Sequence, residues 1–193
     1  MLSTRFHGRG GQGAVIASKL LASALFREGW QVQAFPSFGA ERTGAPVMAF
    51  LRCDHERINE HYQVYEPDHV VVLDSMLLTS VDVTAGLREG GWLIVNTSRS
   101  PEELGIDGAF NVATCDATAI ALAHGLGSRT SPIVNTAMAG AFAAATTLVT
   151  LAAVLDTIPD YVPSSVSANQ QAARDAFGTT LVRGMALVNP RGR

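Results

Sequence analysis

The pattern of apolar and polar positions divides the chain into short apolar runs and longer periodic segments. The strongest run is Val70-Val71-Val72-Leu73, within residues 68–74. A continuous apolar run of this length is typical of a parallel strand that is covered on both faces. Shorter strand patterns are predicted at residues 3–7, 30–35, 47–52, 92–96 and 110–115.

Helical patterns lie between these strands. They are predicted at residues 14–26, 84–89, 117–124, 135–155 and 167–188. The first is apolar on nearly every side, which indicates a buried helix. Ser167 and Gln170 fit a capping box at the start of the last helix. Residues 156–165, with two prolines, are predicted to form the loop before it.

This alternation of strands and helices indicates one α/β domain that extends over residues 1–193. We expect a Rossmann-like fold with a mostly parallel sheet flanked by helices. In the helix predicted at 135–155, the small residues Ala137, Ala141 and Ala145 let another backbone approach closely. Its partner is this chain's own sheet or another subunit, and the sheet is favoured because apolar helices usually cover parallel sheets.

The composition narrows the class of protein. Of 193 residues 47% are hydrophobic and only 16% are charged, and the net charge is −3. The low charge and high hydrophobicity exclude intrinsic disorder. A chain without a basic run is also a poor nucleic-acid binder. Because soluble domains average roughly 25% charged residues, we expect some of the uncharged surface to face a protein partner.

Two further features bear on the compartment. Residues 130–155 carry no charge, but their alanine-rich content favours a buried helix over a membrane span. The N-terminal residues lack the apolar core of a signal peptide, which predicts a cytoplasmic protein. Cys53 and Cys115 lie far apart and form no metal-binding motif. Two reduced thiols are expected, with one disulfide as the alternative.

A glycine-rich segment follows the first predicted strand and precedes the first helix. Its residues are Gly8, Arg9, Gly10, Gly11, Gln12 and Gly13, which match the pattern GxGxxG. Glycines allow a tight turn, and the free N–H groups of the helix start attract phosphate. A dinucleotide site also needs an acid at the end of the second strand, where this chain has Gln33-Ala34-Phe35-Pro36. Three interpretations stay open: a dinucleotide site, a structural turn, and a site for another phosphate-bearing ligand.

Several side chains near this loop are candidates for ligand binding. Lys19, the only lysine, lies six residues after Gly13, and its ammonium group either reaches back toward an anion or extends into solvent. Arg9 is interpreted as a surface side chain that adds positive potential. Asp74 ends the strongest strand, where α/β sheets place ligands, although capping a helix is the commoner role. The five histidines show no ligand spacing, and we expect neither a metal site nor a catalytic residue in this chain.

Three segments carry a family resemblance. They are GRGGQGAV at residues 8–15, FPSFGAERTGAPV at 35–47 and PIVNTAMAGAF at 132–142. Together they resemble the gamma subunit of thiamine-diphosphate-dependent 2-oxoacid:acceptor oxidoreductases, the pyruvate:ferredoxin oxidoreductase family. The pairing of the first two is specific because the second belongs to no generic Rossmann fingerprint.

The resemblance implies one part of a larger enzyme. Such enzymes oxidatively decarboxylate a 2-oxoacid, pass electrons through iron–sulfur clusters and release an acyl-CoA. Thiamine diphosphate, Mg²⁺ and the clusters would then belong to alpha, beta and ferredoxin-like partner subunits, joined by a flavin subunit where NAD is the acceptor. Pyruvate, branched-chain and aryl 2-oxoacids such as phenylglyoxylate all stay open as substrates.

For this chain, the resemblance implies two roles. Gly10–Gly13 and Lys19 would hold the pyrophosphate of coenzyme A, and the segment with Phe38, Glu41 and Arg42 would lie at a subunit junction. The rival hypotheses are a freestanding NAD(P)-linked oxidoreductase and a purely structural assembly module.

Overall fold

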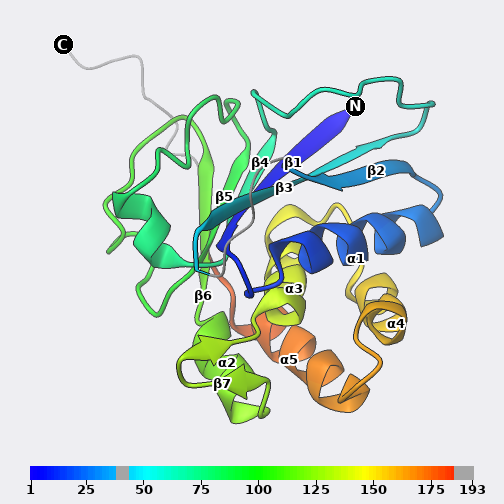
Figure 1. The fold of residues 1–193 in the computed structure, drawn as a ribbon. Helices are drawn as coiled ribbons and strands as arrows, with labels where there is room; N and C mark the ends of the chain where they lie inside the picture. The colour runs from blue at the N-terminus through cyan, green and yellow to red at the C-terminus, as the bar shows by residue number, and fades with distance from the viewer. Residues whose placement is uncertain (38–43, 185–193) are drawn as a thin grey trace.

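The computed structural model describes residues 1–37 and 44–184, which form a seven-stranded sheet covered by helices (Figure 1). The strands of the sheet are β1 (Leu2–Arg9), β2 (Gln31–Pro36), β3 (Pro46–Asp54), β4 (His69–Val72), β5 (Trp92–Asn96), β6 (Asn111–Cys115) and β9 (Leu181–Arg183). Their order in the sheet is β2-β3-β1-β4-β5-β6-β9. The helices are α1 (Ala14–Arg27), α2 (Ala117–Ala123), α3 (Asn135–Thr146), α4 (Leu151–Tyr161) and α5 (Val166–Thr179). A 3₁₀ helix, η1 (Ser75–Thr79), and a two-stranded ribbon of β7 (Gly127–Ser128) and β8 (Ser131–Pro132) complete the described elements.

The centre of the sheet is parallel. Strand β4 pairs in parallel with β1 on one side and β5 on the other, and β5 pairs in parallel with β6. The prediction of an α/β fold with a mostly parallel sheet flanked by helices is confirmed. Strands β2 and β3 were predicted, but their antiparallel pairing and the antiparallel edge strand β9 were not.

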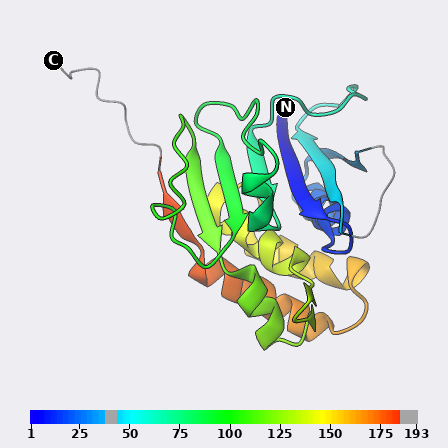
Figure 2. The ribbon, with the colours of Figure 1, turned by 60° about the vertical axis from the view of Figure 1, so that its left-hand side comes forward.

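The two faces of the sheet are covered differently. Helices α1, α3, α4 and α5 lie together on one face (Figure 2), where Val71 and Ile94 belong to the main hydrophobic core. On the other face Val70, Val72 and Leu93 pack with Leu77 of η1 in a smaller core. Because successive residues of a strand point to opposite faces, the apolar run of β4 is buried on both sides, as the sequence predicted.

Helix α3 is the most enclosed helix. Its residues from Asn135 to Ala143 are all buried. A Cβ atom on Gly140 would lie 2.1 Å from the carbonyl oxygen of Ala173, so the backbones of α3 and α5 touch at this glycine. Helix α3 contacts β5 and β6, which confirms the prediction that it packs on its own sheet. Its small residues also admit α5, which was not predicted.

The single helix predicted at residues 135–155 is wrong. It ends at Thr146, because Thr147 adopts a left-handed conformation with φ 53°. A second helix, α4, starts after Thr150, whose hydroxyl accepts a hydrogen bond from the N–H of Ala153 at 3.2 Å. The spacing of apolar residues does not distinguish one long helix from two short helices when the residues between them are also uncharged.

The loop predicted at residues 156–165 is also too long, because α4 continues through Pro159 to Tyr161. A proline inside a helix leaves the carbonyl four residues earlier without its usual donor. Here that carbonyl, of Leu155, accepts a hydrogen bond from Gln170 Nε2 at 3.0 Å. Helix α5 therefore compensates for the proline of α4.

Two other predicted helices differ from the structure. The last helix, predicted at 167–188, ends at Thr179 and is followed by β9, and residues beyond 184 lie outside the described part. Its N-cap is Ser165 rather than the predicted Ser167. The helix predicted at 84–89 is absent from the described chain, which forms turns there. Gly86 has φ 71°, and a Cβ atom on it would lie 2.2 Å from the carbonyl oxygen of Tyr65.

The described helices and the two cysteines agree with the sequence-based expectations. None of the helices in the described ranges is long and apolar enough to cross a membrane. Cys53 and Cys115 are both free and buried, as expected for reduced thiols.

A buried polar pair joins β1 to the turns that cover the smaller core. Arg5 Nε donates a hydrogen bond to His7 Nε2 at 3.0 Å, and its NH2 group donates to the carbonyl oxygens of Val83 and Ala85 at 3.1 and 2.6 Å. Because Nε2 accepts this bond, His7 is neutral in the native state. Burial, and then the neighbouring Arg5 charge, lower the pKa of His7 from 6.5 to about 4.

This low pKa makes the stability of the chain depend on pH. The unfolded chain binds a proton at His7 below about pH 6.5, whereas the native chain does so only near pH 4. Above pH 6.5, His7 therefore does not lower the free energy of unfolding. As the pH falls from 6.5 toward 4, the unfolded chain binds the proton and this free energy decreases. Between pH 7 and 5 we expect a loss of about 2 kcal/mol through this residue, measured by urea unfolding at both pH values.

The variant His7→Gln tests this assignment, because glutamine still offers an oxygen to Arg5 without titrating. This variant should lose less stability between pH 7 and 5 than the wild type, because only the remaining buried histidine, His69, then has a pKa that burial lowers. The control His61→Gln changes an exposed histidine and should leave the pH dependence as it is. An unchanged pH dependence in His7→Gln would contradict the prediction.

Candidate functional site

The glycine-rich loop connects the end of β1 to the start of α1. Gly11 and Gly13 have φ values of +100° and +82°, a region that favours glycine. Gly13 is the N-cap of α1, and no side chain accepts a hydrogen bond from the first turn. The first intrahelical bond to this cap runs from the N–H of Ala17 to the carbonyl of Gly13 at 2.8 Å. The N–H groups at the start of α1 are therefore available to an anion.

A second helix begins beside this loop. A Cβ atom on Gly13 would lie 2.8 Å from Nδ2 of Asn135, the first residue of α3. Helix α3 starts after Val134, whose side chain does not cap it, and Asn135 Oδ1 accepts a hydrogen bond from the N–H of Thr136 at 2.8 Å. Each helix N-terminus carries a partial positive charge. Two of them therefore lie next to each other at Gly13, and only a glycine allows the contact.

The two specific motifs of the sequence meet at this loop. Strand β1 pairs antiparallel with β3, with Arg9 opposite Pro46. The N–H of Gly10 donates to the carbonyl of Ala45 at 3.0 Å, and the N–H of Gly44 donates to the carbonyl of Gly10 at 3.2 Å. The C-terminal end of segment 35–47 therefore lies against the glycine-rich loop. The candidates Phe38, Glu41 and Arg42 lie outside the described residues, and their place at a subunit junction stays a prediction.

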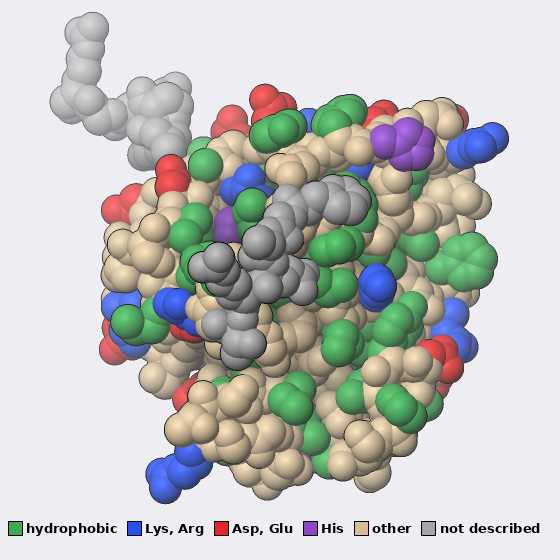
Figure 3. Space-filling view, in the orientation of Figure 1, with side chains coloured by type: hydrophobic (Ala, Val, Ile, Leu, Met, Phe, Trp, Pro, Cys, Tyr) green, Lys and Arg blue, Asp and Glu red, His purple; other side chains and the backbone are tan. Residues whose placement is uncertain are grey.

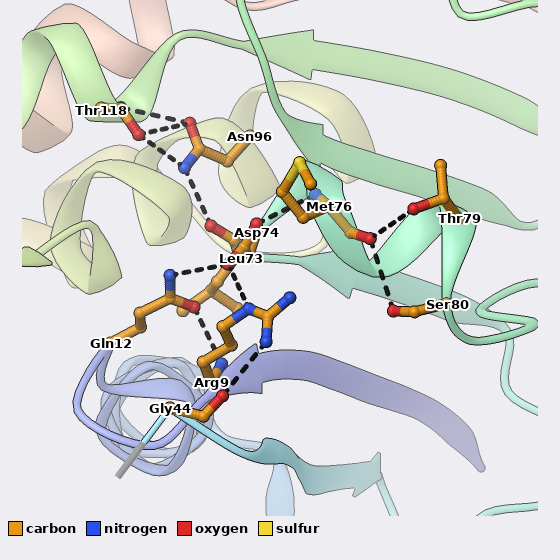
Figure 4. A network of polar contacts seen from close by, with 10 residues as sticks. All are labelled: Arg9, Gln12, Gly44, Leu73, Asp74, Met76, Thr79, Ser80, Asn96 and Thr118. Carbon is orange, nitrogen blue, oxygen red and sulfur yellow. Dashed lines mark hydrogen bonds and ion pairs between the residues drawn. The ribbon is translucent and has the colours of Figure 1, made fainter.

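Arg9 and Gln12 hold the loop against the end of β4 (Figure 4). Arg9 Nε and Gln12 Nε2 both donate to Oδ2 of Asp74, at 2.8 and 3.2 Å, and Gln12 Oε1 accepts from the N–H of Arg9 at 2.8 Å. Arg9 was interpreted as a surface side chain that adds positive potential, and its pairing with Asp74 reduces that potential. Asp74 Oδ1 also accepts from the N–H of Met76 at 2.9 Å, which confirms the predicted cap.

Lys19 lies on the outer side of α1, where it is exposed next to Ile16. It has no ion pair or hydrogen bond within the described part of the chain. Its charge is therefore available, and whether it reaches an anion at the loop stays a prediction. Within the same ranges no three His, Cys, Asp or Glu side chains come together as a metal site would require.

A cleft opens beside the loop at the carboxyl ends of β4, β5 and β6. It has a volume of about 440 Å³ and is lined by Gln12, Asp74, Asn96, Thr97, Asp116 and Thr118 among others. Asn96 organises its floor (Figure 4): Nδ2 donates to the carbonyl of Leu73 at 2.9 Å and to Thr118 Oγ1 at 3.0 Å, and Oδ1 accepts from the N–H of Thr118 at 3.1 Å. The side chains of this floor are thus held in place before any ligand arrives.

Three of these polar residues were not identified from the sequence. Asn96 is the last residue of β5, Asp116 directly follows β6, and Thr118 lies in the first turn of α2. The signal was a polar residue directly after each apolar run, because the carboxyl ends of parallel strands meet at one edge of the sheet. Only Asp74 was singled out, because its strand had the strongest pattern.

The strand order departs from that of a dinucleotide-binding fold. There, the strand that follows the first helix lies next to β1 and supplies the acid for the ribose. Here β3 lies between β1 and β2, which places the end of β2 two strand spacings away, about 10 Å. Together with Phe35 and Pro36 at that end, this arrangement disfavours an NAD site.

Comparisons of sequence and of structure match this chain to the same group of proteins. The sequence profile of the family described as pyruvate ferredoxin/flavodoxin oxidoreductase matches residues 3–179. The pyruvate/ketoisovalerate oxidoreductases common subunit gamma of Thermococcus kodakarensis is 52% identical over 187 residues, which cover 94% of this chain and 98% of that subunit. The pyruvate synthase subunit PorC of Methanocaldococcus jannaschii is 51% identical over 154 residues, which cover 80% of this chain and 82% of that subunit.

Solved structures show the same fold. The crystal structure of the pyruvate oxidoreductase subunit PORC from Thermotoga maritima has a TM-score of 0.78 and 37% identity, and the match covers 94% of this chain and 97% of that chain. The 2-oxoglutarate:ferredoxin oxidoreductase of Magnetococcus marinus has a TM-score of 0.67 at 17% identity. That match covers 92% of this chain and 30% of the longer chain.

Proposed function

The chain belongs to the pyruvate ferredoxin/flavodoxin oxidoreductase family as a gamma subunit, and from that premise we propose that its glycine-rich loop binds the pyrophosphate of coenzyme A. In the assembled enzyme the 2-oxoacid loses its carboxylate as CO₂, two electrons pass to iron–sulfur clusters, and the acyl group is transferred to the thiol of coenzyme A. This subunit supplies none of the groups that make or break those bonds. Its task is to hold one of the reactants.

The observation that carries the proposal is the start of α1. Its free N–H groups lie beside the start of α3, where the N–H of Thr136 donates to Asn135 Oδ1, and Gly13 lies at the contact. Backbone donors and two adjacent partial positive charges suit a diphosphate, which carries charge on several oxygens. Lys19 adds a full positive charge on the same helix. Arg9 is paired with Asp74 and acts by shaping the loop rather than by meeting the anion.

The redox and thiamine groups are proposed to belong to partner subunits. An iron–sulfur cluster needs about four thiolates, and the two cysteines of this sequence lie apart, on β3 and β6. Burial raises the pKa of Cys53 to about 12 and that of Cys115 to about 11, so both stay protonated thiols rather than ligands. We place thiamine diphosphate and Mg²⁺ in alpha and beta subunits, and the clusters in a ferredoxin-like subunit.

The substrate is proposed to be pyruvate or a branched-chain 2-oxoacid. One relative is a subunit common to pyruvate and ketoisovalerate oxidoreductases, and another belongs to a pyruvate synthase. A gamma subunit that serves two enzymes does not select the 2-oxoacid. We therefore place that selection in the partner subunits.

The surface supports an assembly role in addition. In the view of Figure 3, charged side chains lie mostly toward the rim and hydrophobic side chains are spread over the middle and lower part of the face. Ile16 and Phe26 of α1 are 38% and 62% exposed. A face of this kind suits a lasting contact with another subunit. Assembly alone is the second candidate function, in which the glycine-rich loop is only a turn.

Replacing Lys19 with alanine in the assembled enzyme distinguishes the two candidates. If Lys19 neutralises the pyrophosphate, the KM for coenzyme A should rise about tenfold, since one partly exposed charge–phosphate contact is worth roughly 1–1.5 kcal/mol. The kcat value should stay unchanged because no reacting atom is touched. Steady-state kinetics with varied coenzyme A at saturating 2-oxoacid measures both values.

The matched variants are Lys19→Arg, which keeps the charge and should retain most of the affinity, and Arg27→Ala. Arg27 lies at the other end of α1, where it pairs with Asp160, and its loss should leave the KM for coenzyme A as it was. An unchanged KM in Lys19→Ala, with the complex intact, would favour the assembly role alone. Binding of NAD or NADP by this chain in titration calorimetry would instead revive the dinucleotide hypothesis.

A further inference from the structure

Strand β2 forms one end of the described sheet (Figure 1). It pairs antiparallel with β3 over six residues, from Gln31 opposite Asp54 to Pro36 opposite Ala49. No strand within the described ranges lies on its other side. The opposite end of the sheet is formed by β9, which has only three residues. Strand β2 therefore has the longer of the two edges at which the described sheet ends.

The backbone groups on this edge follow from the pairing with β3. The N–H of Ser37 donates to the carbonyl of Met48 at 2.8 Å. In an antiparallel pair, successive residues direct their N–H and C=O groups alternately toward and away from the partner strand. Because Gln33 lies four residues before Ser37, its backbone groups bond to β3. Val32 and Ala34, at the alternate positions, direct their N–H and C=O groups outward.

The edge carries little of the protection that exposed strands usually have. Such strands commonly have charged side chains, prolines or bulges that prevent another strand from pairing. None of the residues 31–36 is charged, and the register with β3 is continuous, without a bulge. Pro36 lies at an outward-facing position, where its missing N–H costs no bond to β3, and it protects only the end of the strand. An edge of this kind is suited to bind an extended chain segment.

Both faces of β2 are already covered within the chain. Val32 and Ala34 pack against the main hydrophobic core on the side of α1. On the other face, the ring centroids of Phe35 and Phe50 lie 5.2 Å apart, and the guanidinium carbon of Arg52 lies 5.2 Å from the centroid of Phe35. The part of β2 that is left for a partner is therefore its edge, with the outward N–H and C=O groups.

We propose that the outer edge of β2 binds an extended strand of another subunit of the enzyme, which adds one strand to the sheet. As a gamma subunit the chain has partner subunits, and β2 leads within two residues to Phe38, which is predicted to lie at a subunit junction. Backbone hydrogen bonds to Val32 and Ala34 hold the added strand. Its side chains on the α1 side are apolar, because they continue the row of Val32 and Ala34 beside the core.

Hydrogen exchange of the backbone amides tests the proposal without a substitution. In the isolated subunit the amides of Val32 and Ala34 should exchange fast, whereas those of Gln33 and Phe35 should exchange slowly because they bond to β3. In the assembled enzyme, the exchange of Val32 and Ala34 should slow by about tenfold or more. Mass spectrometry with residue-resolved fragmentation measures all four amides. Equally fast exchange of Val32 and Ala34 in the two states would overturn the proposal.

The variant Ala34→Pro tests the same edge by blocking it. Proline removes the outward N–H of this residue and no bond to β3, so the isolated variant should keep the circular dichroism spectrum of the wild type. When the tagged subunit is co-expressed with its partner subunits, the variant should retain about tenfold less of them. The matched control Ala34→Ser keeps the N–H and should retain the wild-type amount. A folded Ala34→Pro variant that also retains the wild-type amount would contradict the proposal.

The oligomeric state of the isolated subunit tests which chain occupies the edge. Size-exclusion chromatography with light scattering should show a monomer in which Val32 and Ala34 exchange fast. A dimer in which these two amides are already protected would show that a second copy occupies the edge, and the assignment to another subunit would then be wrong. None of these measurements involves coenzyme A, so a failure here leaves the proposed role of the glycine-rich loop as it was.

Discussion

Replacing Gly140 with alanine is expected to lower the free energy of unfolding by about 3 kcal/mol, with a fall in Tm of about 6–12 °C. The new Cβ atom would lie 2.1 Å from the carbonyl oxygen of Ala173, so α3 and α5 would have to move apart. Both helices are packed in the main core, and their separation would loosen the layer that covers β5 and β6. The higher helix propensity of alanine, about 1 kcal/mol, offsets only part of the cost.

The matched control is Gly178→Ala in α5, where a Cβ atom meets nothing within 4 Å. There the same substitution should leave the stability unchanged or raise it by up to about 1 kcal/mol. Thermal unfolding followed by circular dichroism measures both variants. Equal Tm values for the two variants would contradict the close contact between α3 and α5.

Replacing Gly13 with alanine is expected to raise the KM for coenzyme A by tenfold or more. Alanine is strained by about 1–2 kcal/mol at a φ of +82°. Its Cβ atom would also lie 2.8 Å from Nδ2 and 3.2 Å from Cβ of Asn135, so the first side chain of α3 would have to shift. The N–H groups proposed to bind the pyrophosphate would then no longer converge, and a loss of about 1.4 kcal/mol is already tenfold in affinity. Steady-state kinetics of the assembled enzyme measures the change.

Gly29→Ala separates backbone strain from the effect on the site. Gly29 follows the other end of α1 with φ +92°, and a Cβ atom on it would meet nothing within 4 Å. This variant should lose only the stability that backbone strain costs and keep the wild-type KM for coenzyme A. If both variants have the wild-type KM, the convergence of the two helix starts has no part in binding.

The local patterns of the sequence were sufficient for most individual elements. Strand β4 was identified because four consecutive apolar residues satisfy a strand that is buried on both faces, and α1 because its apolar positions surround the helix. The boundary at Thr147 and the helical state of Pro159 were not predictable from those patterns. The first depends on a single left-handed residue, and the second on Gln170, which is distant in the chain and satisfies the carbonyl of Leu155.

In the candidate site, too, some features were predictable from the local sequence and others were not. Its glycines and its lysine were visible in the sequence, because a glycine-rich turn before a helix has a recognisable pattern. The pairing of Arg9 with Asp74 was not, since the two residues are 65 positions apart. The floor made by Asn96 and Thr118 depends on the strand order, which brings the ends of β4, β5 and β6 together.

By itself, the sequence determined the α/β class, the main parallel strands, the glycine-rich loop and the family resemblance, because each follows from residues that are close in the chain. The tertiary structure decided how the edges of the sheet are built, where the helices break, which charge is already neutralised and where the cleft opens. Those features depend on contacts between residues far apart in the chain, whose energies no local pattern records.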